Sequence, residues 1–145
     1  MKKLLCLLLM VVAVMLTACH DDDSVSVGKV WVYYGYEVSR LDDGAYIIKS
    51  KEEYRQVMGT PMPGDWNIDF GKTALVIAKG TVNQGISGIK AEGNLGDDGE
   101  YIANVTLTLN LTMPIETWGI AIVMPRSSSS DVTLNVSRVN ASRPE

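Results

Sequence analysis

The sequence predicts a mainly β domain, an antiparallel β-sandwich or partly open barrel of about seven strands with one short helix. Short runs rich in Val, Ile, Leu and Tyr recur along the chain, and Gly, Pro, Asn and Asp separate them. One segment combines helical periodicity with helix caps. The 145 residues, 46% of them apolar, suffice for a single domain with its own hydrophobic core.

The first predicted strands lie between residues 25 and 49. Residues 25–38 are dense in β-branched and aromatic side chains, and Gly28 and Gly35 indicate bends or bulges within this stretch. The Asp-Asp-Gly sequence at 42–44 is typical of a turn. It predicts a second, short strand at residues 45–49.

The helix is predicted to begin after Ser50. Ser50 and Glu53 have the spacing of a capping box, in which each side chain accepts a hydrogen bond from a backbone amide near the first turn. Gly59 suits a left-handed C-cap, and Pro61 prevents the helix from continuing. One face is apolar and is expected to pack on the core: Tyr54, Val57 and Met58.

Residues 66–78 predict two strands joined by a turn. Residues 66–70 alternate between apolar and polar as a strand does, and Gly71 with Lys72 suits the turn. Residues 73–78 are apolar on both faces, so we expect a central strand that is buried on both sides. The expected continuation is a polar loop or bulge at 81–88, a strand at 86–92 and a hairpin connection at 93–99.

The last third of the chain predicts three more strands. Residues 105–112 alternate throughout, and the expected core face carries Val105, Leu107, Leu109 and Leu111. Residues 118–124 predict a further strand that Pro125 closes, and residues 127–130 a polar loop. The final strand is indicated by three alternating apolar residues, Val132, Leu134 and Val136.

Residues 1–18 have the features of a secretory signal peptide. Lys2 and Lys3 form a basic start, and the apolar run at 4–16 is shorter than the about 20 residues that a membrane-spanning helix needs. The sequence Leu-Thr-Ala-Cys at 16–19 resembles the lipobox of bacterial lipoproteins. This resemblance implies cleavage before Cys19 and acylation of its thiol, so that the lipid holds the protein on a membrane.

The segment after Cys19 is acidic. Asp21, Asp22 and Asp23 resemble the sorting tract of Bacteroides-type lipoproteins, which implies an outer-membrane location with exposure on the cell surface. A solvated tether is the alternative, and a calcium site lacks the alternating ligand spacing of a calcium loop. Asp-Ser-Val at 23–25 resembles an O-glycosylation acceptor of the same bacteria, with Ser24 as the acceptor. The predicted divisions are a lipoprotein signal peptide (1–18), a lipidated tether (19–29), a β-rich binding domain (30–140) and a tail (141–145).

The residue inventory argues against an enzyme. The single histidine, His20, lies on the tether, so a hydrolytic triad and a zinc site both lack their usual residues, and nucleotide-binding glycine motifs are missing. We therefore expect no cofactor and no metal. A glycosidase-like carboxylate pair, Asp69 with Asp97 or Glu116, stays open. The net charge of −4, or −6 without residues 1–18, disfavours nucleic acid as a partner.

Aromatic side chains are the other candidates for a binding role. Trp66 and Trp118 could stack on a glycan or anchor a protein partner, because flat amphipathic rings supply much contact area for little lost entropy. The alternative is that both indoles belong to the core or to a sheet edge. A Trp118→Ala variant separates the two interpretations. Loss of binding without unfolding indicates a surface anchor, and loss of the thermal transition indicates a core residue.

The order and pattern of four segments resemble the C-terminal domain of the protease complex subunit PrcB family. These segments are residues 48–58, 67–80, 83–89 and 118–125. The resemblance implies a non-catalytic domain that binds another protein, such as a protease, at the cell envelope, with the loop residues Asn83, Gln84 and Gly85 as candidate contacts. A glycine loop and a tryptophan loop on a β-scaffold also look like chagasin-type cysteine protease inhibitors. Convergence of residues 83–87 and 114–118 at one end favours an inhibitor, and tyrosines along a groove favour a surface glycan-binding protein.

Overall fold

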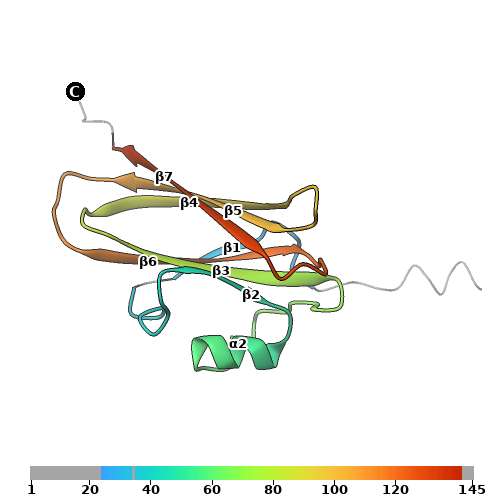
Figure 1. Ribbon diagram of the computed structural model, residues 1–145. Helices are drawn as coiled ribbons and strands as arrows, with labels where there is room; N and C mark the ends of the chain where they lie inside the picture. Colours follow the sequence, from blue (N-terminus) through green and yellow to red (C-terminus); the bar gives the residue numbers. More distant parts are fainter. Residues whose placement is uncertain (1–23, 34, 142–145) are drawn as a thin grey trace, which may run out of the picture.

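The computed structural model describes residues 24–33 and 35–141. Within them, seven strands form two sheets that pack face to face, and one helix covers the outer face of the first sheet (Figure 1). The predicted mainly β fold is confirmed, as a sandwich and not as a closed barrel. The elements are β1 (Val30–Tyr33), β2 (Gly44–Ile48), α2 (Lys51–Met58), β3 (Thr73–Val82), β4 (Ile86–Leu95), β5 (Tyr101–Leu109), β6 (Glu116–Pro125) and β7 (Val132–Asn140).

The first sheet has the strand order β1-β6-β3-β2 and the second has the order β4-β5-β7. Neighbouring strands are antiparallel except at one edge, where β7 runs parallel to β5. The connection from β6 to β7 crosses between the sheets and delivers β7 to the end at which β5 begins. The second sheet is therefore mixed, which the expectation of a purely antiparallel sandwich did not include.

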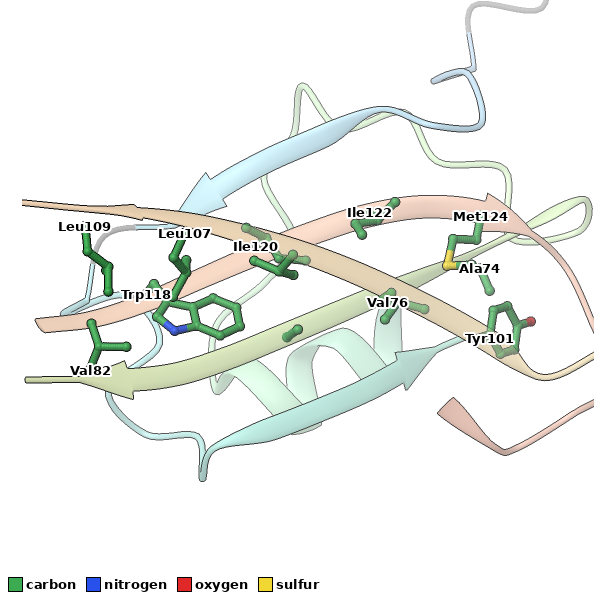
Figure 2. Close-up of a cluster of buried hydrophobic side chains, with 13 residues drawn as sticks. Ala74, Val76, Val82, Tyr101, Leu107, Leu109, Trp118, Ile120, Ile122 and Met124 are labelled. Carbon is green, nitrogen blue, oxygen red and sulfur yellow. The ribbon is translucent and has the colours of Figure 1, made fainter. Parts of the chain in front are cut away.

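The main core fills the space between the two sheets. Leu107 on β5 and Ile120 and Ile122 on β6 are fully buried there (Figure 2). A second core lies on the opposite face of the first sheet, where α2 and its flanking loops cover Leu75 and Ile77 of β3. β3 is thus buried on both faces over residues 73–78, as predicted. Among the described residues, the main core draws on side chains of the strands, and the second core also draws on α2 and connecting segments.

The helix has the predicted caps. The Ser50 Oγ accepts a hydrogen bond from the Glu53 amide at 3.1 Å, and Gly59 ends the helix in the left-handed region with φ 71°. The Glu53 carboxylate accepts from the amide of Lys49 at 2.6 Å, one residue before the amide that a standard capping box uses. Tyr54 and Met58 are buried against the first sheet, so the apolar face packs where its spacing placed it.

Connections alternate between the two ends of the sandwich (Figure 1). The end that we call proximal receives the chain at residues 25–28, because the Val25 amide donates to the Asn67 carbonyl and the Gly28 amide to the Val123 carbonyl, both at 2.8 Å. The loops after β2, β4 and β6 lie at the same end. The opposite, distal end carries the β1–β2, β3–β4 and β5–β6 connections and the end of β7.

The predicted strand at 66–70 is wrong. This segment belongs to the loop between α2 and β3, and its backbone bonds are local or go to the amino-terminal segment: the Ile68 amide donates to the Trp66 carbonyl at 3.0 Å, and Asn67 accepts from Val25. Trp66 and Ile68 are nevertheless buried. The alternation arises because one side of this loop packs on the second core. Such one-sided burial does not require hydrogen bonding to a neighbouring strand.

Several element boundaries also differ from expectation. β1 covers only residues 30–33 of the predicted stretch 25–38, because the chain then turns at Gly35, where a Cβ would lie 3.0 Å from the Thr117 carbonyl oxygen. β3 continues to Val82, so the polar loop shrinks from 81–88 to 83–85. β4 likewise extends to Leu95, beyond the predicted end at residue 92.

Candidate functional site

The two tryptophans predicted as possible binding residues are buried. Trp118 is 3% exposed and lies in the main core against Gly80 of β3 (Figure 2). Trp66 is 8% exposed and stacks on Trp31 with ring centroids 3.9 Å apart. Neither indole is available as a surface anchor, and the interpretation of both as core residues is confirmed.

The two loops singled out from the sequence do meet at the distal end. The Gly85 amide donates to the Thr112 carbonyl at 3.1 Å, and the Asn110 amide donates to the Gly85 carbonyl at 2.8 Å. The Glu116 carboxylate accepts from the Ile86 amide at 2.8 Å. The β3–β4 loop (83–85) is therefore fastened to both sides of the β5–β6 loop (110–115).

Close packing at Gly85 holds these loops together. A Cβ on Gly85 would overlap the Thr112 hydroxyl and the Asn110 amide group, so the approach requires glycine. Asn110 also accepts from the Thr112 amide at 3.0 Å and forms a short hydrogen bond with the Thr112 hydroxyl. Of the three predicted loop residues, Gly85 is buried and structural, while Gln84 is half-buried and Asn83 is exposed.

Above this fastened base, the β5–β6 loop exposes three large apolar side chains. Leu111, Met113 and Ile115 are 81%, 84% and 78% exposed. We call these three residues the apolar tip. The loop from 110 to 115 carries no charged residue, so no charge separates the three side chains.

The sequence analysis missed the apolar tip because it placed Leu111 on the core face of a strand at 105–112. β5 instead ends at Leu109, and the carbonyl of that residue accepts a hydrogen bond from the Ala141 amide at 2.8 Å. The facing sheet does not extend over the residues that follow. The sequence does contain a signal for an exposed apolar loop: Pro114 lies among large apolar residues, and proline interrupts a strand.

The carboxylates considered for glycoside chemistry lie at both ends of the sandwich. Asp69 lies in the turn before β3, where it accepts from the Gly71 amide at 2.9 Å. Glu116 lies at the opposite end of β3, about 30 Å away by strand rise, far beyond the spacing of a glycosidase pair. Asp97 lies on the β4–β5 hairpin at the proximal end. Among residues 24–33 and 35–141, no group of three or more His, Cys, Asp or Glu side chains comes together.

Charged and phenolic groups near the distal end support the fold. The Lys79 ammonium lies 2.9 Å from the Asp43 carboxylate and donates to the Leu41 carbonyl at 2.7 Å. Its hydrogen bond lowers the pKa of Asp43. Below the first sheet, the hydroxyls of Tyr33 and Tyr54 are 3.0 Å apart, and burial raises the pKa of both.

The predicted membrane signals lie largely outside the described residues. This holds for the signal peptide at 1–18, for Cys19, and for Asp21, Asp22 and Asp23. Ser24, the predicted glycosylation site, is described and is half-buried in a bend. In the portion of the chain that the structure covers, no helix is both long and apolar enough to cross a bilayer.

Comparison of the chain with protein-family models, with curated proteins and with solved structures gives no match. The functional argument therefore starts from the geometry of the distal end and from the sequence signals at the amino terminus.

Proposed function

We propose that the protein is an envelope-anchored lipoprotein whose β-sandwich acts as a non-catalytic protein-binding domain. The apolar tip carries this proposal. Leu111, Met113 and Ile115 expose their side chains to water although the same chain buries 25 other apolar residues in its two cores. Large apolar side chains gathered on an exposed protrusion are typical of an interaction site.

The free energy available from the apolar tip is substantial. Burying one Leu, Met or Ile side chain in a partner contributes roughly 1.5–3 kcal/mol. The hydrogen bonds of Gly85, Asn110 and Thr112 fix the base of the loop before any partner arrives. A preorganised loop loses less conformational entropy on binding, so more of the burial energy appears as affinity.

The position of the apolar tip supports a partner other than the anchoring bilayer. The chain enters at the proximal end, and the ten residues of β6 separate the ends by about 31 Å. The six peptide steps from Cys19 to Val25 span at most about 20 Å. A domain standing on its lipid therefore presents the apolar tip away from that bilayer, toward other proteins of the envelope.

Protease inhibition is the second candidate, and one observation favours it. Residues 83–87 and 114–118 come together at one end of the scaffold through the Ile86 amide and the Glu116 carboxylate, as an inhibitor requires. The bond from Gly85 to Thr112 lies beside them. In this function the apolar tip would occupy the substrate cleft of a protease. The glycan-binding alternative loses Trp66 and Trp118, which are buried. Its other predicted feature is present, because Tyr33, Tyr36 and Tyr54 line one hollow beside α2.

The test compares two triple variants of the full-length lipoprotein in its native envelope. The tip variant replaces Leu111, Met113 and Ile115 by Ser, and the matched control replaces three other exposed apolar residues, Val27, Val136 and Val139, by Ser. Chemical crosslinking and mass spectrometry identify the bound protein. We expect the wild type and the control to recover the same partner and the tip variant to lose it, with all three unfolding at similar temperatures.

Two further measurements separate the parts of the proposal. Recovery of the partner by the tip variant at the wild-type level contradicts the role of the apolar tip. Fatty-acid labelling tests the anchor: the wild type is expected to incorporate the label and Cys19→Ser to remain unlabelled. If the recovered partner is a protease, its activity in the presence of the purified domain distinguishes an inhibitor from an adaptor.

A further inference from the structure

An open hollow at the proximal end is lined by three cations. Lys49 follows β2, Lys72 precedes β3 and Arg126 follows β6, and all three line a depression of about 610 Å³ together with Gly71, Ser127 and Ser128. None of the described residues that line it is acidic, although the chain contains 17 acidic and 13 basic residues. The local charge of the hollow is therefore opposite to that of the protein as a whole.

The framework of the hollow is held in place by hydrogen bonds between loops. The Arg126 guanidinium donates to the carbonyls of Phe70 and Lys49, and the Arg126 amide donates to the Lys72 carbonyl at 2.9 Å. The Lys49 ammonium donates to the Ser129 carbonyl at 2.7 Å. These bonds bring cations from three separate loops to one place.

The nearest ion pair is weak enough to yield to a ligand. The Lys72 ammonium lies 3.8 Å from Asp69, and the two side chains are 72% and 36% exposed. Exposed pairs of this kind contribute little to stability. The largely exposed Lys72 side chain lines the hollow, and the exposed Ser128 hydroxyl adds a neutral donor at its rim.

The chemistry of this hollow suits a phosphate group. A guanidinium offers paired donors to phosphate oxygens, and lysine ammonium groups add point charges that neutralise the anion. The hollow is open and shallow, so it fits a phosphate carried on a surface better than an enclosed metabolite. Its position indicates which surface: the loops at 67–72 and 126–128 lie beside the segment through which the chain enters the domain.

We propose that the cationic hollow binds the phosphate of a membrane lipid headgroup next to the lipid anchor. The inference rests on the proposed acylation of Cys19, which holds the proximal end within about 20 Å of the bilayer. The acyl chains then supply attachment and the hollow supplies orientation. Headgroup contact at the proximal end keeps the domain upright and the apolar tip directed away from the membrane.

The experiment uses the mature chain, residues 19–145, with Cys19→Ser so that no acyl group contributes to binding. The chain is sedimented at low salt with vesicles of phosphatidylcholine alone or of phosphatidylcholine mixed with phosphatidylglycerol. We expect more protein on the mixed vesicles, and about tenfold or more weaker binding for the double variant Lys72→Gln, Arg126→Gln. The matched control Lys90→Gln, Arg138→Gln removes the same charge from exposed positions outside the hollow and is expected to bind as the parent chain does.

Each other outcome overturns the proposal. Equal sedimentation with both vesicle types, or equal loss in both double variants, leaves no role for the cationic hollow. Inorganic phosphate that shifts the amide NMR signals of residues 126–128, without any vesicle binding, assigns the hollow to a free anion. Lys72→Gln alone alters a side chain that is 72% exposed, and it is expected to weaken vesicle binding without lowering the unfolding temperature. The vesicle assay contains no protein partner, so its result does not depend on the proposed protein-binding function of the apolar tip.

Discussion

The indole of Trp118 on β6 lies against the backbone of Gly80 on β3, the residue paired with it across the first sheet. A Cβ at position 80 would lie 2.5 Å from Cζ2 of the indole, closer than packed atoms approach. The missing side chain of Gly80 thus leaves the space that the indole fills. Figure 2 shows Trp118 among the side chains of the main core. A small residue on one strand and a large one on its neighbour fill this layer together.

Gly80→Ala is therefore expected to lower the free energy of unfolding by about 1–3 kcal/mol, because the added methyl group overpacks the site. Urea unfolding followed by tryptophan fluorescence measures the change. Gly88→Ala is the control, since a Cβ there meets Thr108 at an ordinary 3.6 Å. A Gly80→Ala midpoint equal to that of Gly88→Ala would show that the indole moves aside freely.

Trp118→Ala removes the other half of this contact. The indole is 3% exposed, so its truncation is expected to cost about 3–5 kcal/mol and to abolish or strongly lower the cooperative thermal transition. Differential scanning calorimetry gives the result directly. A surface anchor would behave in the opposite way, with an unchanged transition, and that outcome would contradict the burial of the ring.

Alkaline pH is expected to destabilise the fold through Tyr33 and Tyr54. Burial raises the pKa of both hydroxyls above the ordinary value of 10.0, so the folded state keeps their protons longer than the unfolded chain. The stabilisation is complete below pH 10 and is lost as the pH rises beyond it. The urea midpoint should fall in this range for the wild type and fall less steeply for Tyr33→Phe.

Tyr36→Phe provides the comparison for the alkaline measurement. Tyr36 is 78% exposed, so its replacement removes a hydroxyl without disturbing either core. Equal pH dependence in the wild type and in Tyr33→Phe would mean that the buried hydroxyl of Tyr33 does not contribute to alkaline unfolding.

The sequence predicted those parts of the fold that local rules govern. The caps at Ser50 and Gly59 and the alternating burial of β5 depend on residues close together in the chain, so pattern alone located them. The parallel pairing of β7 with β5 and the loop at 66–70 depend on which partner lies alongside in space. Periodicity reports burial, and it does not report the hydrogen-bond partner.

The same distinction explains the candidate site. The sequence alone did not decide whether residues 83–87 and 114–118 converge, because their contact depends on the register of β3, β5 and β6. Leu111 continued the alternation of β5 in sequence, but the facing sheet ends before it, so its side chain is exposed. The cationic hollow joins Lys49, Lys72 and Arg126 from three loops, and no spacing in the chain relates them.

Gly85→Ala tests whether the fastened base of the β5–β6 loop matters for binding. The new methyl group would overlap the Thr112 hydroxyl and the Asn110 amide group, so the loop must move away from residues 83–85. The hydrogen bonds of the Gly85 and Asn110 amides should break, and hydrogen exchange at these two positions should speed up. The apolar tip keeps its three side chains but loses its preorganisation.

Partner crosslinking of Gly85→Ala is accordingly expected to weaken although Leu111, Met113 and Ile115 are intact. Gly64→Ala is the matched control, because a Cβ at that position meets nothing within 4 Å. Faster exchange with full crosslinking would show that the apolar tip binds without a fixed base, and the affinity would then come from side-chain burial alone. Weaker crosslinking together with faster hydrogen exchange would show that the affinity depends on the loop geometry that Gly85 imposes. A loop that becomes ordered only on binding loses conformational entropy, and this loss offsets part of the free energy gained from burying its side chains.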